Sequence, residues 1–248
     1  MSVNNPFFEI SLLPYQAPRF DAINDSHYRP AFDEAMRLKR ADIDAIIAQR
    51  AAPDFDNTVL ALEKSGAMLS RVSSVFFAMT SAHTNDDLQA LDEQFSTELA
   101  GLANDIWLND TLFARVEAVW QDREALDAES RRLTEEMYQH FVLAGARLNA
   151  DEKAELKALN TEAATLTSQF NQRLLAANKA GGLVVDNVHQ LDGLSAEEVA
   201  AAAHAAAEKG LTDRWLIPLL NTTQQPALAA LSLRETRKKL FSAGWERT

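Results

Sequence analysis

The chain of 248 residues contains no cysteine. It therefore forms neither disulfides nor thiolate metal sites, and thiolate catalysis is excluded. A cysteine-free composition suits a reducing compartment. The first residues do not place a basic region before an apolar run, so we expect no secretory signal. No stretch approaches the roughly 18 apolar residues that a membrane span requires, and we expect a cytoplasmic protein.

Basic residues are also scarce. The 24 Lys and Arg stand against 36 Asp and Glu, which gives a formal net charge of −12. Such a charge repels phosphate backbones and anionic lipids, so we expect no nucleic acid and no membrane partner. Hydrophobic residues make up 47% and charged residues 24% of the chain, as is usual in a soluble globular protein.

Complete catalytic motifs are missing as well. No two histidines are four residues apart, so the helical HExxH zinc pair is absent. Neither GxSxG nor SxxK occurs. The histidines are His27, His83, His140, His189 and His204, and the adjacent acids include Asp86–Asp87, Asp92–Glu93, Glu135–Glu136 and Glu197–Glu198. Isolated histidines and adjacent helical acids are typical of ordinary protein surfaces, with His140 expected to be partly buried. We therefore assign no catalytic, cofactor-binding or metal residue to this chain.

What the sequence has in abundance is apolar residues at helical spacing. After an irregular segment at 1–25 with three prolines, this spacing predicts helices over 26–50, 57–82, 111–126 and 129–147. A further helix is predicted to begin at a capping box of Thr84 and Asp87.

The longest predicted helix covers 149–180. Asn149 and Glu152 can cap its start, and Gly181–Gly182 offer a left-handed stop. Its apolar residues fall on one side: Leu156, Leu159, Ala163, Leu166, Phe170, Leu174 and Ala177. The other faces are polar but mostly uncharged, whereas a solvated face usually carries Lys and Glu. We predict a scaffold helix within a larger helical wall, with some polar side chains buried or facing a cavity.

The pattern changes after Gly182. Short runs rich in β-branched and apolar residues predict a small β element at about 183–190 and 214–220. Between them, Ser195 and Glu198 form a capping box for a helix that stops at Gly210. The polar cluster of residues 221–225 could line a cleft or bind a peptide backbone, but a plain loop is the favoured interpretation. From about Pro226 a helical segment carries Arg234, Arg237, Lys238, Lys239 and Arg247.

These elements predict a mainly α fold, an antiparallel helical bundle or wall with a small late β element. We expect residues 1–248 to form a single helical region. Within it, the irregular segment is 1–25, the long helices occupy 26–180, and the β element with its helices occupies 181–248.

Longer strings are more specific than these patterns. The chain contains NPFFEISLLPYQAPRFDAINDSHYRPAFDEAM, FDNTVLALEKSG, SVFFAMTSAHTNDDLQALDEQFS, LNTEAATLTSQFNQRLLAANK and WLIPLLNTTQQPAL. It also contains the spacing R-x-x-R-x-x-L-F-x-x-G-W over 234–245. From about Asn5 to Arg247, these strings resemble the N-terminal portion of bacterial peptidyl-dipeptidases, in the thimet oligopeptidase and oligopeptidase A family of zinc metallopeptidases.

The resemblance implies a two-lobed, mostly helical enzyme with a deep channel that admits oligopeptides, from which C-terminal dipeptides are released. It also implies a zinc ion held by HExxH and a downstream Glu, with the HExxH Glu as base. None of the zinc ligands, the catalytic Glu or the Tyr and His transition-state donors has a matching position here. We therefore expect a channel wall that binds no zinc, cuts no peptide alone and partners a missing catalytic region.

Two other interpretations remain open. The chain could be a non-catalytic helical scaffold or peptide-binding module that reuses the same fold. More weakly, it could be a helical enzyme with its own carboxylate metal site.

Overall fold

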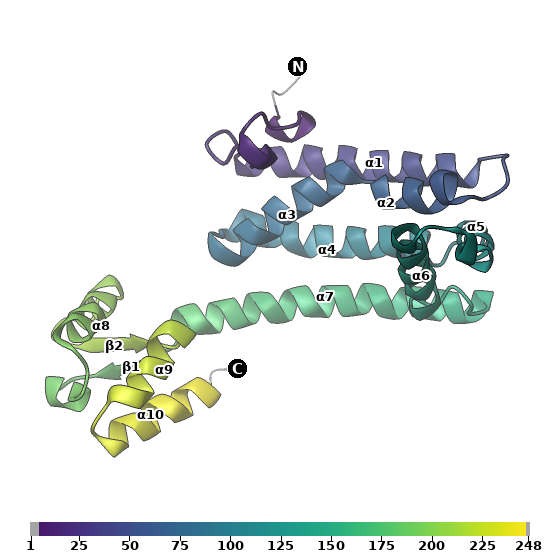
Figure 1. Cartoon of the computed structure of the whole chain (residues 1–248). Helices are drawn as coiled ribbons and strands as arrows, with labels where there is room; N and C mark the ends of the chain where they lie inside the picture. Colours follow the sequence, from purple (N-terminus) through teal and green to yellow (C-terminus); the bar gives the residue numbers. More distant parts are fainter. Residues whose placement is uncertain (1–4, 247–248) are drawn as a thin grey trace. The chain divides into compact units, whose positions relative to one another are not determined.

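The computed structural model describes residues 5–246, and Figure 1 shows its course. Arg247 of the predicted basic segment lies outside these residues. The chain divides into two compact units, Met1–Ser168 and Gln169–Thr248, with the boundary inside the helix predicted at 149–180. Each unit is described by itself.

The first unit is built from helices joined by short turns. Its helices are α1 (Tyr28–Ile47), α2 (Ala61–Lys64), α3 (Ala67–Ala82), α4 (Asp86–Trp107), α5 (Asp110–Gln121), α6 (Ala128–Leu143) and the first part of α7 (Ala150–Ala180). Single 3-10 turns at Pro6–Phe8, Pro14–Gln16, Asp25–His27 and Arg123–Ala125 and a π-helical turn at Phe55–Leu60 connect or precede them.

Aromatic side chains fill the centre of this unit, where α1, α3 and α4 lie side by side (Figure 1). Phe32 stacks on Phe95 with ring centroids 3.8 Å apart. Phe76 meets both rings edge-on, at 5.4 Å from Phe32 and 5.0 Å from Phe95. All three are fully buried. Such edge-on and offset pairs add to the free energy of apolar burial, so they fix the three helices against one another.

The helix predicted over 57–82 is interrupted, so that prediction was wrong in its continuity. Ser65 is extended and Gly66 is left-handed, with φ of 75°. Neighbouring α1 stabilises the break, because Lys39 Nζ donates to Ser65 O at 3.2 Å and Gly66 N donates to Asp42 Oδ2 at 3.1 Å. These long-range contacts satisfy the backbone groups that a helix end leaves unpaired.

The helix start predicted at Thr84 was also wrong by one residue. Asn85 is the N-cap of α4, and its Oδ1 accepts from Leu88 N at 2.9 Å. Asparagine is a better N-cap than threonine, which accounts for the shift.

Helix α7 confirms its predicted start and its predicted end at Ala180, but the predicted left-handed stop was wrong. Asn149 Oδ1 accepts from Glu152 N at 3.0 Å, and Asn149 N donates to Glu152 Oε2 at 2.9 Å. Neither Gly181 nor Gly182 has a positive φ. Glycine is needed there for space, because a Cβ on Gly182 would overlap the side chain of Leu216.

The second unit holds the β element and three further helices. Strands β1 (Gly182–Val185) and β2 (Trp215–Pro218) pair antiparallel, with Gly182 opposite Pro218 and Val185 opposite Trp215. Around them lie α8 (Ala196–Glu208), α9 (Asn221–Ala230) and α10 (Arg234–Trp245), after a 3-10 turn at Val188–Leu191. A mainly α chain with a small late β element is thus confirmed, although β1 is shorter than the range 183–190.

The sequence predicted the start of α8 in this unit correctly but did not predict the start of α9. Ser195 and Glu198 form the predicted capping box, with Oε2 of Glu198 accepting from Ser195 N at 2.8 Å. Residues 221–225 are not a loop but the first half of α9. Thr223 Oγ1 donates to Pro218 O at 2.7 Å, just before the helix, and Gln224 Nε2 donates to Leu240 O of α10 at 3.3 Å, so a contact with another helix adds to the local one at this helix start.

Within residues 5–246, no helix combines the length and apolar character that crossing a membrane demands.

Candidate functional site

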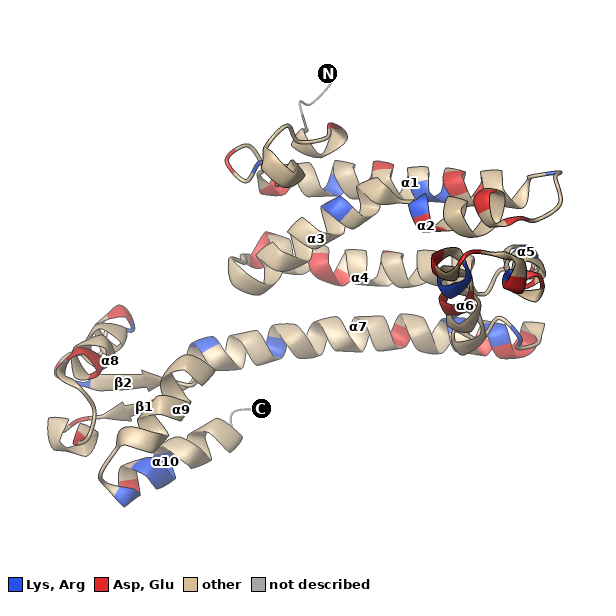
Figure 2. Cartoon of the chain, viewed as in Figure 1, with Lys and Arg blue, Asp and Glu red and all other residues tan. Residues whose placement is uncertain are grey.

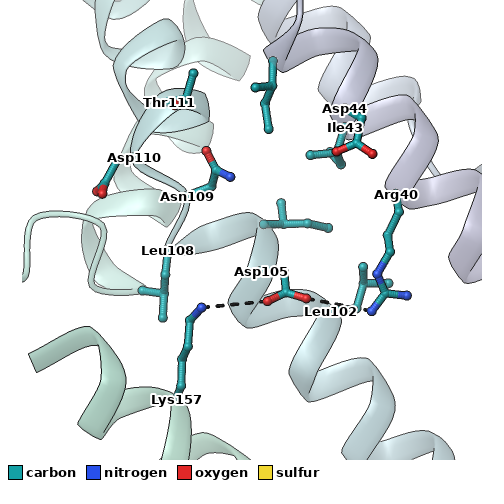
Figure 3. Close-up of a pocket in the computed structure, with 12 residues that line it drawn as sticks. Arg40, Ile43, Asp44, Leu102, Asp105, Leu108, Asn109, Asp110, Thr111 and Lys157 are labelled. Atoms are coloured by element: carbon teal, nitrogen blue, oxygen red, sulfur yellow. Dashed lines mark ion pairs between the residues drawn. The ribbon is translucent and has the colours of Figure 1, made fainter. Parts of the chain in front are cut away.

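The candidate site is a polar cavity of about 580 Å³ in the first unit (Figure 3). Its walls come from α1, α4, the turn before α5, the start of α5, and α7. It is lined by Arg40, Ile43, Asp44, Ile47, Leu102, Asp105, Ile106, Leu108, Asn109, Asp110, Thr111 and Lys157. Apolar side chains close its floor and charged side chains border it, so it can accept a polar ligand.

Asp105 lies between two cations at the edge of this cavity. Arg40 Nη2 of α1 is 3.9 Å from Asp105 Oδ2, and Lys157 Nζ of α7 is 3.8 Å from Asp105 Oδ1, as Figure 3 shows. All three side chains are about half exposed. Ion pairs with such long N–O distances and such exposed side chains contribute little to stability, so both cations remain available to a ligand.

The start of α5 forms another side of the cavity. Asn109 Oδ1 accepts from Leu112 N at 2.9 Å and caps the helix. Asp110 in the first turn pairs with Lys153 Nζ of α7, and this lysine is buried. A carboxylate in the first turn is favoured by the helix dipole. The pair of the buried Lys153 and the exposed Asp110 therefore connects α7 to the start of α5 beside the cavity.

The lining of this cavity suits the binding of a polar ligand. Its carboxylates, Asp44, Asp105 and Asp110, come from three different helices, and Figure 3 shows them apart. Among the described residues, no group of three or more His, Asp or Glu side chains is arranged to hold a metal ion. The one hydroxyl on its lining, that of Thr111, forms no hydrogen bond to a base within the described residues. The cavity thus lacks a nucleophile paired with a base.

A second polar cluster joins Lys39 and Ser65. Lys39 Nζ is 2.6 Å from Ser65 Oγ, and burial lowers the pKa of the Lys39 ammonium. The Ser65 hydroxyl donates its own proton to Leu62 O at 2.5 Å. Lysine is therefore the donor to Ser65 Oγ, which is the reverse of general-base activation. The pair stabilises the end of α2.

The histidines are dispersed over the fold. His27 is the buried one, and its Nδ1 accepts from Asn24 N at 3.2 Å. The prediction that His140 is partly buried was wrong, because His140 is exposed. Its ring contacts that of Trp107, with the ring centroids 4.1 Å apart. His83, His189 and His204 are exposed as well.

The adjacent acids occupy ordinary helical positions. Asp86–Asp87 and Glu197–Glu198 lie in the first turns of α4 and α8, as the charge preference of a helix N-terminus predicts. Glu135 is 3.4 Å from Arg123, and Glu136 pairs with Arg132. None of these pairs lines the cavity.

Sequence reasoning did not identify the charged residues of the cavity. Arg40, Asp105 and Lys157 lie on three different helices, and successive members of this set are more than 50 residues apart along the chain. Each was indistinguishable from a solvated surface charge. The mostly uncharged polar faces of the long helix predicted polar side chains that are buried or face a cavity, but the α7 residue on this lining is the charged Lys157.

Known proteins give a clear match to the whole chain. The sequence is 67% identical to the dipeptidyl carboxypeptidase of Salmonella typhimurium over 245 residues, which is 98% of this chain and 36% of that protein. It is also 67% identical to the dipeptidyl carboxypeptidase of Escherichia coli over 249 residues, or 100% of this chain and 37% of that protein. A probable cytosolic oligopeptidase A of Arabidopsis thaliana is 22% identical over 237 residues, 92% of this chain and 34% of its own. No family model matches the sequence.

The predicted resemblance to peptidyl-dipeptidases and oligopeptidase A is thereby confirmed. The chain spans little more than a third of the length of the relatives that it matches, which fits the predicted N-terminal portion.

Proposed function

We propose that this chain is the N-terminal part of a zinc-dependent peptidyl-dipeptidase that releases C-terminal dipeptides from oligopeptides. The observation that carries the proposal is 67% identity over the full chain to two proteins named dipeptidyl carboxypeptidase. In this proposal the chain forms a wall of the substrate channel in the cytoplasm and takes no direct part in the chemistry. The cavity beside Asp105 supports a binding role.

The residues present do not fit the zinc ion that this activity requires. A catalytic zinc site needs three closely placed protein ligands, usually His, Glu or Asp. The sequence has no HExxH, its histidines lie on separate elements, and the described residues offer no cluster that could hold a metal. The proposal therefore places zinc, its ligands and the catalytic base in the part of the relatives that this chain does not cover.

The test is dipeptide release by purified 1–248. A peptide blocked at its N-terminus is incubated with the chain and added zinc, and the E. coli dipeptidyl carboxypeptidase serves as the active control. We expect no release above background from 1–248, because no residue here can activate water. Robust release that a chelator abolishes contradicts the proposal.

A non-catalytic peptide-binding module is the alternative, and the separate buried core of each unit favours it. A module predicts a monomer with little exposed apolar surface. A part of a larger enzyme predicts exposed apolar surface, and hence dye binding or oligomers. Light scattering together with a hydrophobic dye separates the two: a dye-silent monomer supports the module.

A further inference from the structure

Helix α7 turns its polar side toward the first unit. Lys153 is buried and forms an ion pair with Asp110 of α5, and Asn160 Nδ2 donates to Asn104 Oδ1 of α4 at 2.7 Å. One turn further, the hydroxyls of Thr165 and Thr97 are 3.3 Å apart. These contacts fix which side of α7 faces the unit.

The apolar side of the same helix is therefore left uncovered. Leu159 is 55% exposed and Leu166 is 56% exposed. Ala163 lies between them and is exposed too. We call Leu159, Ala163 and Leu166 the α7 stripe. Spacings of four and three residues place the three side chains in one row along the helix. An uncovered apolar row of this kind usually marks an interaction site.

The shape and charge of the α7 stripe indicate its partner. Two leucines separated by two turns with a small alanine between them form a ridge and a gap that suit another α-helix. Glu155 and Glu162 border the same side of the stripe, and within residues 5–246 neither forms an ion pair. A partner helix with an apolar face bordered by Lys or Arg would complement this surface.

The source of that helix follows from the length of the relatives. The two dipeptidyl carboxypeptidases are 67% identical to this chain, and nearly two-thirds of their own length lies outside the match. We infer that the α7 stripe is the docking seat for an amphipathic, basic-edged helix from that remaining part of the peptidase. This inference rests on the proposed function and specifies which surface joins the chain to its catalytic region.

The experiment co-expresses tagged 1–248 with the part of the E. coli dipeptidyl carboxypeptidase that this chain does not match. Capture of that part is compared for the unchanged chain, for Leu159→Gln/Leu166→Gln, and for the matched control Ala154→Gln/Ala158→Gln. The control adds the same two glutamines to exposed positions of α7 outside the stripe. We expect the stripe variant to lower capture at least tenfold and the control to leave it within twofold. A third variant, Glu155→Lys/Glu162→Lys, is expected to lower capture severalfold through charge repulsion.

A second measurement does not depend on disruptive substitutions. Because the chain has no cysteine, Ala163→Cys and Ala158→Cys each accept a single environment-sensitive fluorophore before the remaining part is added. We expect a blue shift from position 163 and a much smaller one from position 158.

The outcomes separate the occupants and the two proposals. No capture by the unchanged chain, or equal capture by the stripe variant, overturns the docking inference. A homodimer of 1–248 that only the stripe variant abolishes overturns it in favour of a second copy. An assembly that forms through the stripe but releases no dipeptides upholds the docking inference and contradicts the proposed function. If the assembly releases dipeptides and the stripe variant assembles as well as the unchanged chain, the result supports the proposed function and overturns the docking inference.

Discussion

Arg115 of α5 holds the segment between α1 and α2 in place. It is only 8% exposed. Its Nη1 donates to Gln49 O at 3.1 Å and to Ala51 O at 3.4 Å, and its Nη2 donates to Asn57 Oδ1 at 2.8 Å and to Thr58 Oγ1 at 3.2 Å. Every acceptor is neutral, and Nε is buried with no partner in the described structure. One guanidinium therefore organises the whole connection, and we predict that Arg115→Met destabilises the first unit.

The expected loss is the difference between two opposing effects. A hydrogen bond from a charged donor contributes roughly 1.5–3 kcal/mol, but four bonds from one group are not additive. The substitution also removes a buried cation with an unpartnered nitrogen, which is itself costly, while methionine retains most of the apolar packing. We expect the free energy of unfolding of the first unit to fall by about 2–3 kcal/mol.

The assay must separate the two units, because a chain with two units need not unfold in one step. Amide hydrogen exchange resolved by segment does this: residues 49–58 should lose protection and residues 182–191 should not. Arg131→Met is the matched control, since Arg131 on α6 is partly exposed and pairs with the exposed Glu124 at 3.1 Å. An exposed pair contributes less than about 1 kcal/mol.

The prediction is contradicted if Arg115→Met lowers the free energy of unfolding no more than Arg131→Met does. It is also contradicted if the amides of residues 49–58 keep their protection against hydrogen exchange. Either result would mean that backbone and apolar contacts hold this connection without the guanidinium.

Three further predictions concern backbone space and one carboxylate. Gly193→Ala should destabilise the second unit by more than ~1 kcal/mol, because φ is +103° and the added Cβ would overlap Ala230 O; thermal melting measures the loss. Gly101→Ala should have the opposite effect and stabilise the first unit by ~0.5–1 kcal/mol, because alanine favours the helical state more than glycine does. Gly101 lies in the middle of α4, and nothing lies within 4 Å of the added Cβ. Burial raises the pKa of Asp92, against a smaller lowering by the Ser96 hydroxyl, so the folded state binds this proton more tightly than the unfolded state. The resulting stability is present at low pH and lost as pH rises through the folded pKa. Asp92→Asn should therefore raise the melting temperature at pH 7, with a gain that shrinks below about pH 4; an equal gain at both pH values contradicts this.

Local signals in the sequence predicted the helix starts that depend on neighbours in the chain. The pairs Asn149–Glu152 and Ser195–Glu198 cap α7 and α8 as predicted, because both partners of each cap lie within one turn. The composition and spacing also sufficed for a mainly α fold with a late β element.

Features set by distant residues could not be predicted in this way. The break at Gly66 depends on Asp42 of α1, and the helical state of residues 221–225 depends on contacts such as Gln224 with Leu240 O. The charged residues of the cavity could not be predicted as a group for the same reason, because they lie on three helices that come together only when the unit folds. The basic residues that crowd onto α10 in Figure 2 were predicted as a segment, but the break that separates α10 from α9 was not.

Helix α7 shows why an apolar pattern alone does not identify what buries it. The row that contains Leu159 and Leu166 lies on one side of the helix, as its spacing predicts, yet the side that packs on α4 carries Asn160 and Thr165. An amphipathic pattern shows that one side of a helix is apolar, but it does not show which segment or partner buries that side. Leu159 and Leu166 are both more than half exposed, and the docking inference accounts for them as the seat of a partner helix. If the α7 stripe is that seat, the first unit should gain stability when the remaining part of the peptidase binds, by an amount that rises with the partner's concentration. A melting temperature of the first unit that does not change across that titration would remove this explanation of the pattern.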